Sequence, residues 1–216
     1  MSGASFITLA WPETKVVSEG KWYDYPMTWL GFIRNGYYSA GHAAFLTIDH
    51  QNGLVQYYDF GRYQTPMQHG RVRNIETDPE LKICTKAKVE DEKVLNIHEI
   101  LNEVSNIKST HGDGRIEASI YYGIDLTILK QFIANWQERD FIPYGPFKIG
   151  GTNCSRFVSV SFRKCVPSIL LWIKLYLPYT FSSTPMSNVR LIGERIPHNP
   201  PIDALEHIFS NNYQYI

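Results

Sequence analysis

Residues 41–60 read GHAAFLTIDHQNGLVQYYDF, and this stretch decides the class of fold. Two apolar runs, 43–48 and 54–60, flank a turn that contains Asn52 and Gly53. Asn-Gly between two apolar runs is the strongest short-range signal of a β-hairpin. The stretch therefore predicts two antiparallel strands joined by a tight turn.

The segments that follow alternate between helical and extended patterns. Residues 96–107 carry apolar side chains three and four positions apart, which is typical of an amphipathic helix with Asn96 as its N-cap. Residues 115–122 alternate as a strand does, Asp125 is placed to cap a second helix, and a third helix begins near Cys154. This order predicts an α+β fold, in which an antiparallel sheet packs against helices.

Three other parts of the chain complete this prediction. The first 40 residues lack helical periodicity and are predicted to be loops and short extended pieces. The apolar segment 166–181 is too short, and too interrupted by prolines, to span a bilayer, so it predicts a buried helix from Ser168 to Leu177. A surface that dips into lipid is the alternative for this segment. The last 35 residues, rich in Pro, Ser and Asn, are predicted to wrap around the core as a tail.

The composition excludes several classes of protein. The chain has 216 residues, of which 44% are hydrophobic and 14% aromatic, so it can bury a core and is not a disordered protein. Its 21 basic residues balance 21 acidic ones, which does not favour nucleic acid or an anionic membrane surface as a partner. The N-terminus shows neither a basic region nor a long apolar one, so we expect no signal peptide and a cytoplasmic location.

Common cofactor motifs are missing from the sequence. The three cysteines stand at positions 84, 154 and 165 and form no CxxC pair. There is no HExxH or HxxxH, and residues 145–151, GPFKIGG, lack the Lys-Ser/Thr ending of a P-loop. We therefore expect no metal site and no nucleotide cofactor.

Cys154 is the candidate nucleophile because of its position. Two glycines and the capping pair Thr152 and Asn153 precede it, and the apolar-faced helix CSRFVSVSF follows. A thiol at a helix N-terminus feels the positive end of the helix dipole, which lowers its pKa, and the free N–H groups there can hold an oxyanion. Cys84 and Cys165 lack this setting and are predicted to be structural. The alternative for Cys154 is likewise structural, as a small buried residue.

His42 is the candidate general base among the seven histidines. It opens a strand directly after Gly41, and there a rigid backbone can hold the imidazole at the edge of a cleft. The alternative is a histidine whose hydrogen bonds are satisfied within the core.

A third polar residue commonly orients the imidazole, and the register of the hairpin selects it. If the Asn-Gly pair is the turn, Leu46 pairs with Asp59, which then shares a face with His42 at a separation of four positions. Asp59 is therefore the first choice, and Gln56, which points to the other face in this register, is the second. The alternative role of Asp59 is a structural ion pair with Arg62.

The stretches GHAAFLTI (41–48) and TNCSRFV (152–158), in this order, resemble the permuted papain-like cysteine hydrolases. This superfamily includes the lecithin–retinol acyltransferase group and relatives of the NlpC cell-wall peptidases. The resemblance implies His42 as the base, Cys154 as the nucleophile, and a papain-like core whose Cys-bearing helix packs on the sheet. The acyltransferase group has a second His on the strand after the first, where this chain has Gln, Tyr and Asp, and this leaves the third catalytic residue open.

Together these observations predict a single domain, 1–216, with a catalytic core at 41–163 and with 1–40 and 166–216 packing around it. We expect a cysteine-dependent amidase or peptidase that acts on a peptide, amide or acyl small-molecule substrate. Tyr144 is predicted to pack rather than to line the cleft. A lipid-directed thiol acyltransferase is one alternative function. Another is a non-catalytic binding domain, with a recognition surface formed by aromatic residues of the N-terminal region: Trp11, Trp22, Trp29, Tyr37 and Tyr38.

Overall fold

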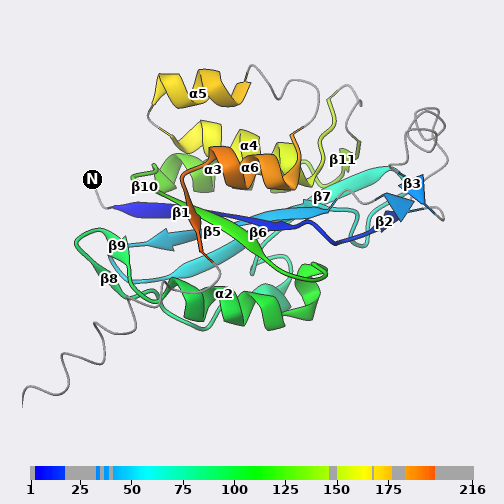
Figure 1. Cartoon of the computed structure of the whole chain (residues 1–216). Helices are drawn as coiled ribbons and strands as arrows, with labels where there is room; N and C mark the ends of the chain where they lie inside the picture. The colour runs from blue at the N-terminus through cyan, green and yellow to red at the C-terminus, as the bar shows by residue number, and fades with distance from the viewer. Residues whose placement is uncertain are drawn as a thin grey trace, which may run out of the picture.

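The computed structural model describes the chain in these segments: 3–17, 33–34, 37–38, 41–145, 150–166, 168–176 and 183–197. Within them, seven antiparallel strands form one large sheet with helices on both faces, so the α+β prediction is confirmed (Figure 1). The strand order is β11 (Ile142–Pro143), β7 (His69–Arg73), β6 (Val55–Gly61), β5 (His42–Asp49), β1 (Ala4–Trp11), β10 (Glu117–Tyr122) and β12 (Glu194–Ile196).

Helices cover the two faces of the sheet unequally. On one face lies α2 (Ile97–Asn106), and on the other lie α3 (Leu126–Gln137), α4 (Cys154–Cys165) and α6 (Pro185–Leu191), with α5 (Ile169–Tyr176) outside α4 (Figure 1). The smaller elements are β2 (Val16–Val17), β3 (Ile33–Arg34), β4 (Tyr37–Tyr38), β8 (Val89–Glu90), β9 (Lys93–Val94) and the 3₁₀ turns Pro79–Leu81 and Lys108–Thr110.

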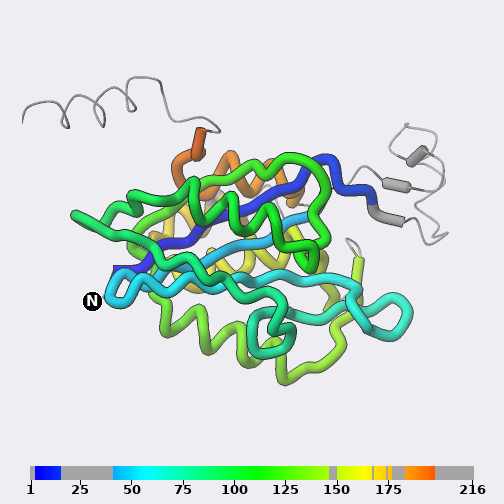
Figure 2. Tube along the Cα trace, turned by 90° about the horizontal axis from the view of Figure 1, so that it is seen from below, coloured from blue at the N-terminus to red at the C-terminus, as the bar shows by residue number. Residues whose placement is uncertain are grey.

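The first strand corrects the prediction that the N-terminal 40 residues form loops and short pieces. β1 is eight residues long, every one of them buried, and it is an interior strand of the sheet, between β5 and β10 (Figure 2). A strand with both faces covered shows a continuous apolar run rather than alternation, so its pattern is hard to distinguish from that of a buried loop. Trp11 is 1% exposed and therefore belongs to no recognition surface. Trp22 and Trp29 lie outside the described part of the chain, and Tyr37 and Tyr38 form the short strand β4, of which the backbone alone is described.

The β5–β6 hairpin forms as predicted but in a different register. Asp59 pairs with Ala44 rather than with Leu46, because the loop spans the four residues 50–53. The side chain of Asp49 shapes this loop: its two carboxylate oxygens accept hydrogen bonds from the Gln51 N–H at 2.9 Å and from the Asn52 amide at 3.1 Å. A shift of two residues keeps each side chain on its predicted face and brings Asp59 from four to two positions from His42.

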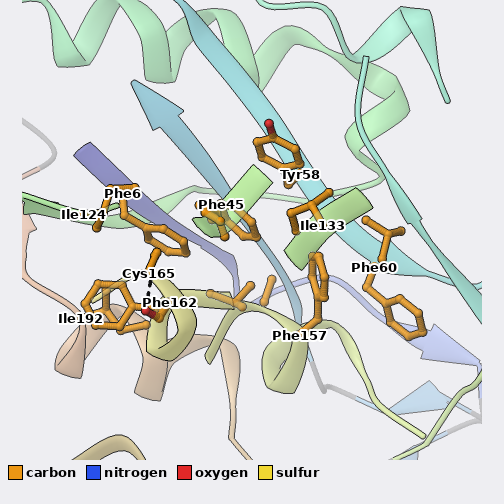
Figure 3. Close-up of a cluster of buried hydrophobic side chains, with 14 of the residues drawn as sticks. Phe6, Phe45, Tyr58, Phe60, Ile124, Ile133, Phe157, Phe162, Cys165 and Ile192 are labelled. Atoms are coloured by element: carbon orange, nitrogen blue, oxygen red, sulfur yellow. Dashed lines mark hydrogen bonds between the residues drawn. The ribbon is translucent and has the colours of Figure 1, made fainter. Parts of the chain in front are cut away.

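Aromatic packing holds α4 against the sheet. In the core between the sheet and the helices α3 and α4, the ring of Phe6 stacks on that of Phe45 with centroids 4.4 Å apart, and Phe157 lies 5.8 Å from Phe45 (Figure 3). Burial of one such side chain is worth roughly 1.5–3 kcal/mol. The first turn of α4 is therefore fixed relative to β5.

Helix α5 has the predicted position but not the predicted burial. Leu175 is 1% exposed, whereas Ile169 and Leu170 are exposed, Leu170 to 76%. Trp172 and Tyr176 stack on each other at 4.9 Å on the outer side of the molecule. A run that is apolar all round gives no periodicity from which the buried side could be read. Among the described residues, no helix is both long and apolar enough to cross a membrane.

The C-terminal segment is not a tail without secondary structure. Thr184 and Ser187 form a capping box at the start of α6, and the following strand, β12, pairs with β10. A Ser at the third helical position replaces the usual Glu or Gln of the capping box, which obscures the signal in the sequence. The prediction for residues 198–216 lies outside the described residues.

Candidate active site

Cys154 occupies the first position of α4. Asn153 caps the helix from an extended conformation, and its side-chain oxygen accepts a hydrogen bond of 2.8 Å from the Arg156 N–H. Asn188 of α6 donates a hydrogen bond of 2.7 Å to the carbonyl oxygen of Ser155, which fixes the first turn from the outer side. Cys154 is 8% exposed, so the sulfur lies at the border of the core rather than deep within it.

His42 is held at the first position of β5 by its neighbours on both sides. Gly41 has φ of +70°, and a Cβ there would lie 2.9 Å from the carbonyl oxygen of Trp11, so the position requires glycine. The imidazole stacks on the Trp11 ring at 5.6 Å and meets the Tyr63 ring edge-on at 6.4 Å. With 6% of its surface exposed, His42 has little rotational freedom.

Asp59 lies behind the imidazole. Its Oδ2 atom is 3.4 Å from Nε2 of His42, and its side chain is fully buried. The two atoms form a long ion pair rather than a well-aligned hydrogen bond. Nε2 accordingly has no hydrogen-bond partner among the described residues. Gln56, the second choice, faces away from His42, and its side-chain oxygen accepts a hydrogen bond from the Tyr58 hydroxyl.

Cys154 and His42 interact and shift each other's titration. Burial alone would raise the pKa of the thiol, but hydrogen bonding to His42, the positive charge of His42 and the Ala43 N–H together hold it below its ordinary value. Burial alone would lower the pKa of the imidazole, but its interactions with Asp59 and Cys154 raise it to about 9. The two groups therefore favour a thiolate–imidazolium pair at neutral pH.

Tyr144 both packs in the core and reaches the Cys154 sulfur. Its ring stacks on Phe60 at 5.7 Å, as predicted. Its hydroxyl also interacts with Cys154, and burial together with the negative charge of that sulfur raises its pKa well above the ordinary value. The side chain therefore keeps its proton and acts as a hydrogen-bond donor beside the sulfur.

Sequence reasoning missed the principal partner of Asp59. The structure gives this carboxylate Arg73 of β7 as a bidentate partner, whereas Arg62 lies over the ring of Tyr144 at 5.2 Å. Asp59 and Arg73 are opposite each other in the β6–β7 pairing. Alternation along β7 alone could not have identified the pair, because the intervening loop does not fix the register.

The other two cysteines lack this environment. Cys84 is exposed, and Cys165 is buried at the far end of α4, where burial raises its pKa to about 12. No group of His, Cys, Asp and Glu side chains in the described segments is arranged to hold a metal ion. The groups that meet at Cys154 and His42 are a thiol, an imidazole and a carboxylate.

Comparison with known proteins agrees with this architecture. Residues 6–167 match the family described as type VI secretion system effector TseH-like. The chain belongs to this family. The crystal structure of the type VI secretion system effector TseH is similar to it with a TM-score of 0.51 and 20% sequence identity, over 74% of this chain and 75% of that one. At this identity the likeness concerns the fold alone. The search of curated proteins gives no match.

Proposed function

We propose that this member of the TseH-like family is a type VI secretion effector that hydrolyses amide or peptide bonds through a cysteine nucleophile. The observation that carries the proposal is the contact between Cys154 and His42, with the carboxylate of Asp59 behind the imidazole. A thiolate, a positioned imidazole and a third orienting group are the parts that acyl transfer by cysteine requires. The order of His on an early strand and Cys on a late helix further supports membership of the permuted papain-like superfamily.

In the acylation step, the Cys154 thiolate attacks the carbonyl carbon of the substrate. The backbone N–H at the start of α4 and the Tyr144 hydroxyl are donors beside the sulfur, and they would stabilise the negative oxygen of the tetrahedral intermediate. When the C–N bond breaks, the His42 imidazolium gives its proton to the departing amine. The products of this step are a thioester on Cys154, a free amine and a neutral imidazole.

In the deacylation step, neutral His42 takes a proton from water, and the resulting hydroxide attacks the thioester. The carbon–sulfur bond breaks, the acid is released, and the thiolate–imidazolium pair is restored. Asp59 holds the imidazole in one orientation through both steps. Besides the substrate, the two steps use only side chains and backbone groups of the protein and one water molecule. We place the protein in the cytoplasm before its delivery.

A lipid-directed thiol acyltransferase is the second candidate, because α5 presents exposed apolar and aromatic side chains. In that case the thioester would be resolved by an acceptor at a membrane surface. Co-sedimentation with vesicles that contain anionic and neutral lipids tests this candidate. Loss of sedimentation on Leu170→Asp would support it, and the absence of sedimentation of the wild type would exclude it.

Alkylation of the thiols tests the hydrolase. At pH 6 a free thiol is about 0.3% ionised, so Cys154 should react with iodoacetamide about tenfold faster or more if it is a thiolate. The exposed Cys84 serves as an internal reference in the same sample, with each site read by peptide mass spectrometry. In His42→Ala the rate at Cys154 should fall below that of Cys84, because burial then raises the thiol pKa. Equal, slow rates at Cys154 in both proteins would refute the proposal.

A further inference from the structure

Oδ2 of Asp59, the oxygen that faces His42, is shared among three donors. It accepts hydrogen bonds from Nη2 of Arg73 at 2.6 Å and from the Tyr57 hydroxyl at 3.1 Å. Nε2 of His42 lies farther away, at 3.4 Å. The second oxygen, Oδ1, is occupied by Nε of Arg73 at 2.9 Å. The carboxylate is therefore bound more closely by Arg73 and Tyr57 than by the imidazole.

Arg73 itself is fixed from several directions. Its Nη2 donates a second hydrogen bond, of 3.0 Å, to the carbonyl oxygen of Ser109, and its guanidinium carbon lies 3.4 Å from the centroid of the Tyr63 ring. The side chain is buried, which alone would lower its pKa, but the paired carboxylate of Asp59 raises the pKa and keeps the guanidinium charged. Tyr63 in turn contacts His42 on one side and stacks on His111 at 4.8 Å on the other. Arg73 cannot move away from Asp59 without disturbing this group of rings.

We infer that Arg73 is a positioning residue that limits how strongly Asp59 holds the proton of His42. The inference rests on the proposed function, in which His42 must both give up a proton and take one back. A carboxylate with its full negative charge directed at the imidazolium would keep that proton in place. Arg73 draws the charge of Asp59 toward itself and leaves His42 with the longer contact, so the proton stays transferable.

The charged and titratable groups around His42 come from several elements, and each can influence the titration of His42. They are Tyr57 and Asp59 on β6, Tyr63 after it, Arg73 on β7, His111 after the second 3₁₀ turn and Cys154 on α4. Burial and the charge of Arg73 lower the pKa of His111, whereas that of His42 is raised to about 9. The two histidines therefore titrate in separate ranges, and NMR of protein with ¹⁵N-labelled histidine can follow them individually.

The variant Arg73→Met removes the competing cation. We expect the titration midpoint of His42 to move upward by about one pH unit, since an unshared carboxylate within 4 Å shifts a partner by 1–3 units. Arg73→Lys keeps a positive charge beside Asp59 and should leave the midpoint close to that of the wild type. Arg195→Met is the control: Arg195 pairs with Glu117 between β12 and β10, away from β6 and β7, so His42 should be unaffected.

A second, more conservative variant tests the inference if Arg73→Met does not fold. Tyr57→Phe removes one donor from the same oxygen without changing any charge, and it should shift the midpoint of His42 upward by a few tenths of a pH unit. An unchanged or lowered midpoint in both Arg73→Met and Tyr57→Phe would overturn the inference. Because the measurement needs no substrate, it remains informative if Cys154 proves unreactive, and failure of the inference is distinguishable from failure of the proposed function.

Discussion

The buried pair of Asp59 and Arg73 predicts that removing one partner destabilises the protein more than removing both. The two side chains are almost fully buried and are joined by hydrogen bonds of 2.9 and 2.6 Å. A buried charge left without its partner typically costs about 3–5 kcal/mol. In Asp59→Asn the guanidinium loses its carboxylate, so we expect a loss in this range. In Arg73→Met the imidazolium of His42 still faces Asp59, so we expect the lower end of the range.

The double variant Asp59→Asn with Arg73→Met removes both charges and keeps a similar side-chain volume. Its free energy of unfolding should lie within about 1–2 kcal/mol of the wild type, because both charges of the pair are gone and the His42 imidazolium still has the Cys154 thiolate as its partner. The four proteins form a double-mutant cycle, read by urea unfolding at pH 7 with tryptophan fluorescence. From these values we expect a coupling energy of about 4 kcal/mol or more.

A second cycle on Glu117 and Arg195 is the control for this measurement. This pair joins β10 to β12, and its arginine is exposed, with 58% of the side chain accessible. Water screens the pair, so its coupling energy should be smaller. Additive effects in the Asp59–Arg73 cycle, or a larger coupling in the control cycle, would refute the reasoning.

Three further predictions concern pH, the helix α5 and the residue before His42. Iodoacetate is an anion, so the imidazolium should attract it to Cys154, and Cys154 should react faster with iodoacetate, relative to neutral iodoacetamide, than Cys84 does. This rate ratio should fall as the pH rises through about 9, where His42 loses its proton; a ratio that stays high to pH 10 would contradict this. By linkage, the stability that this raised pKa contributes is full below about pH 6.5 and is lost through the same upper range. Leu175→Ala should lower the free energy of unfolding by about 2–5 kcal/mol and Leu170→Ala by no more than about 0.5, because the first side chain is buried and the second exposed; equal urea midpoints would show that the buried side of α5 is assigned wrongly. Gly41→Ala should cost more than about 1 kcal/mol and slow the alkylation of Cys154, because a Cβ at this φ is strained and collides with a backbone oxygen; unchanged unfolding and labelling would contradict the requirement for glycine.

The parts of the site that local rules control could be predicted from the sequence. A capping Asn before Cys154 and a glycine before His42 act within a few residues, and the structure places both residues as those signals indicate. The shared face of His42 and Asp59 follows from the alternation of side chains along a hairpin, which holds for any register of even shift. The distance between them did not follow, since it depends on how the side chain of Asp49 widens the turn.

Contacts between distant segments could not be predicted in this way. Arg73 reaches Asp59 through the pairing of two strands joined by a long loop, and no local pattern fixes that register. The interior position of β1 depends on the strands at residues 42–49 and 117–122, which pair with it on either side. The exposed side of α5 is decided by which neighbours cover it, and its sequence, apolar except for one lysine, does not show which side they cover.

The hydrogen bond by which α6 holds the first turn of α4 has a consequence for the folding of the newly synthesised chain. Asn188, which holds the first turn of α4 through Ser155, is translated 34 positions after Cys154. At about 5–20 residues per second, the ribosome needs roughly 2 to 7 s to add the residues from Cys154 to Asn188. Through that interval the nascent polypeptide already contains His42, Asp59 and Cys154 but not the helix that holds the first turn of α4. Folding of this turn is thus timed by the synthesis of α6 rather than by the appearance of the cysteine itself.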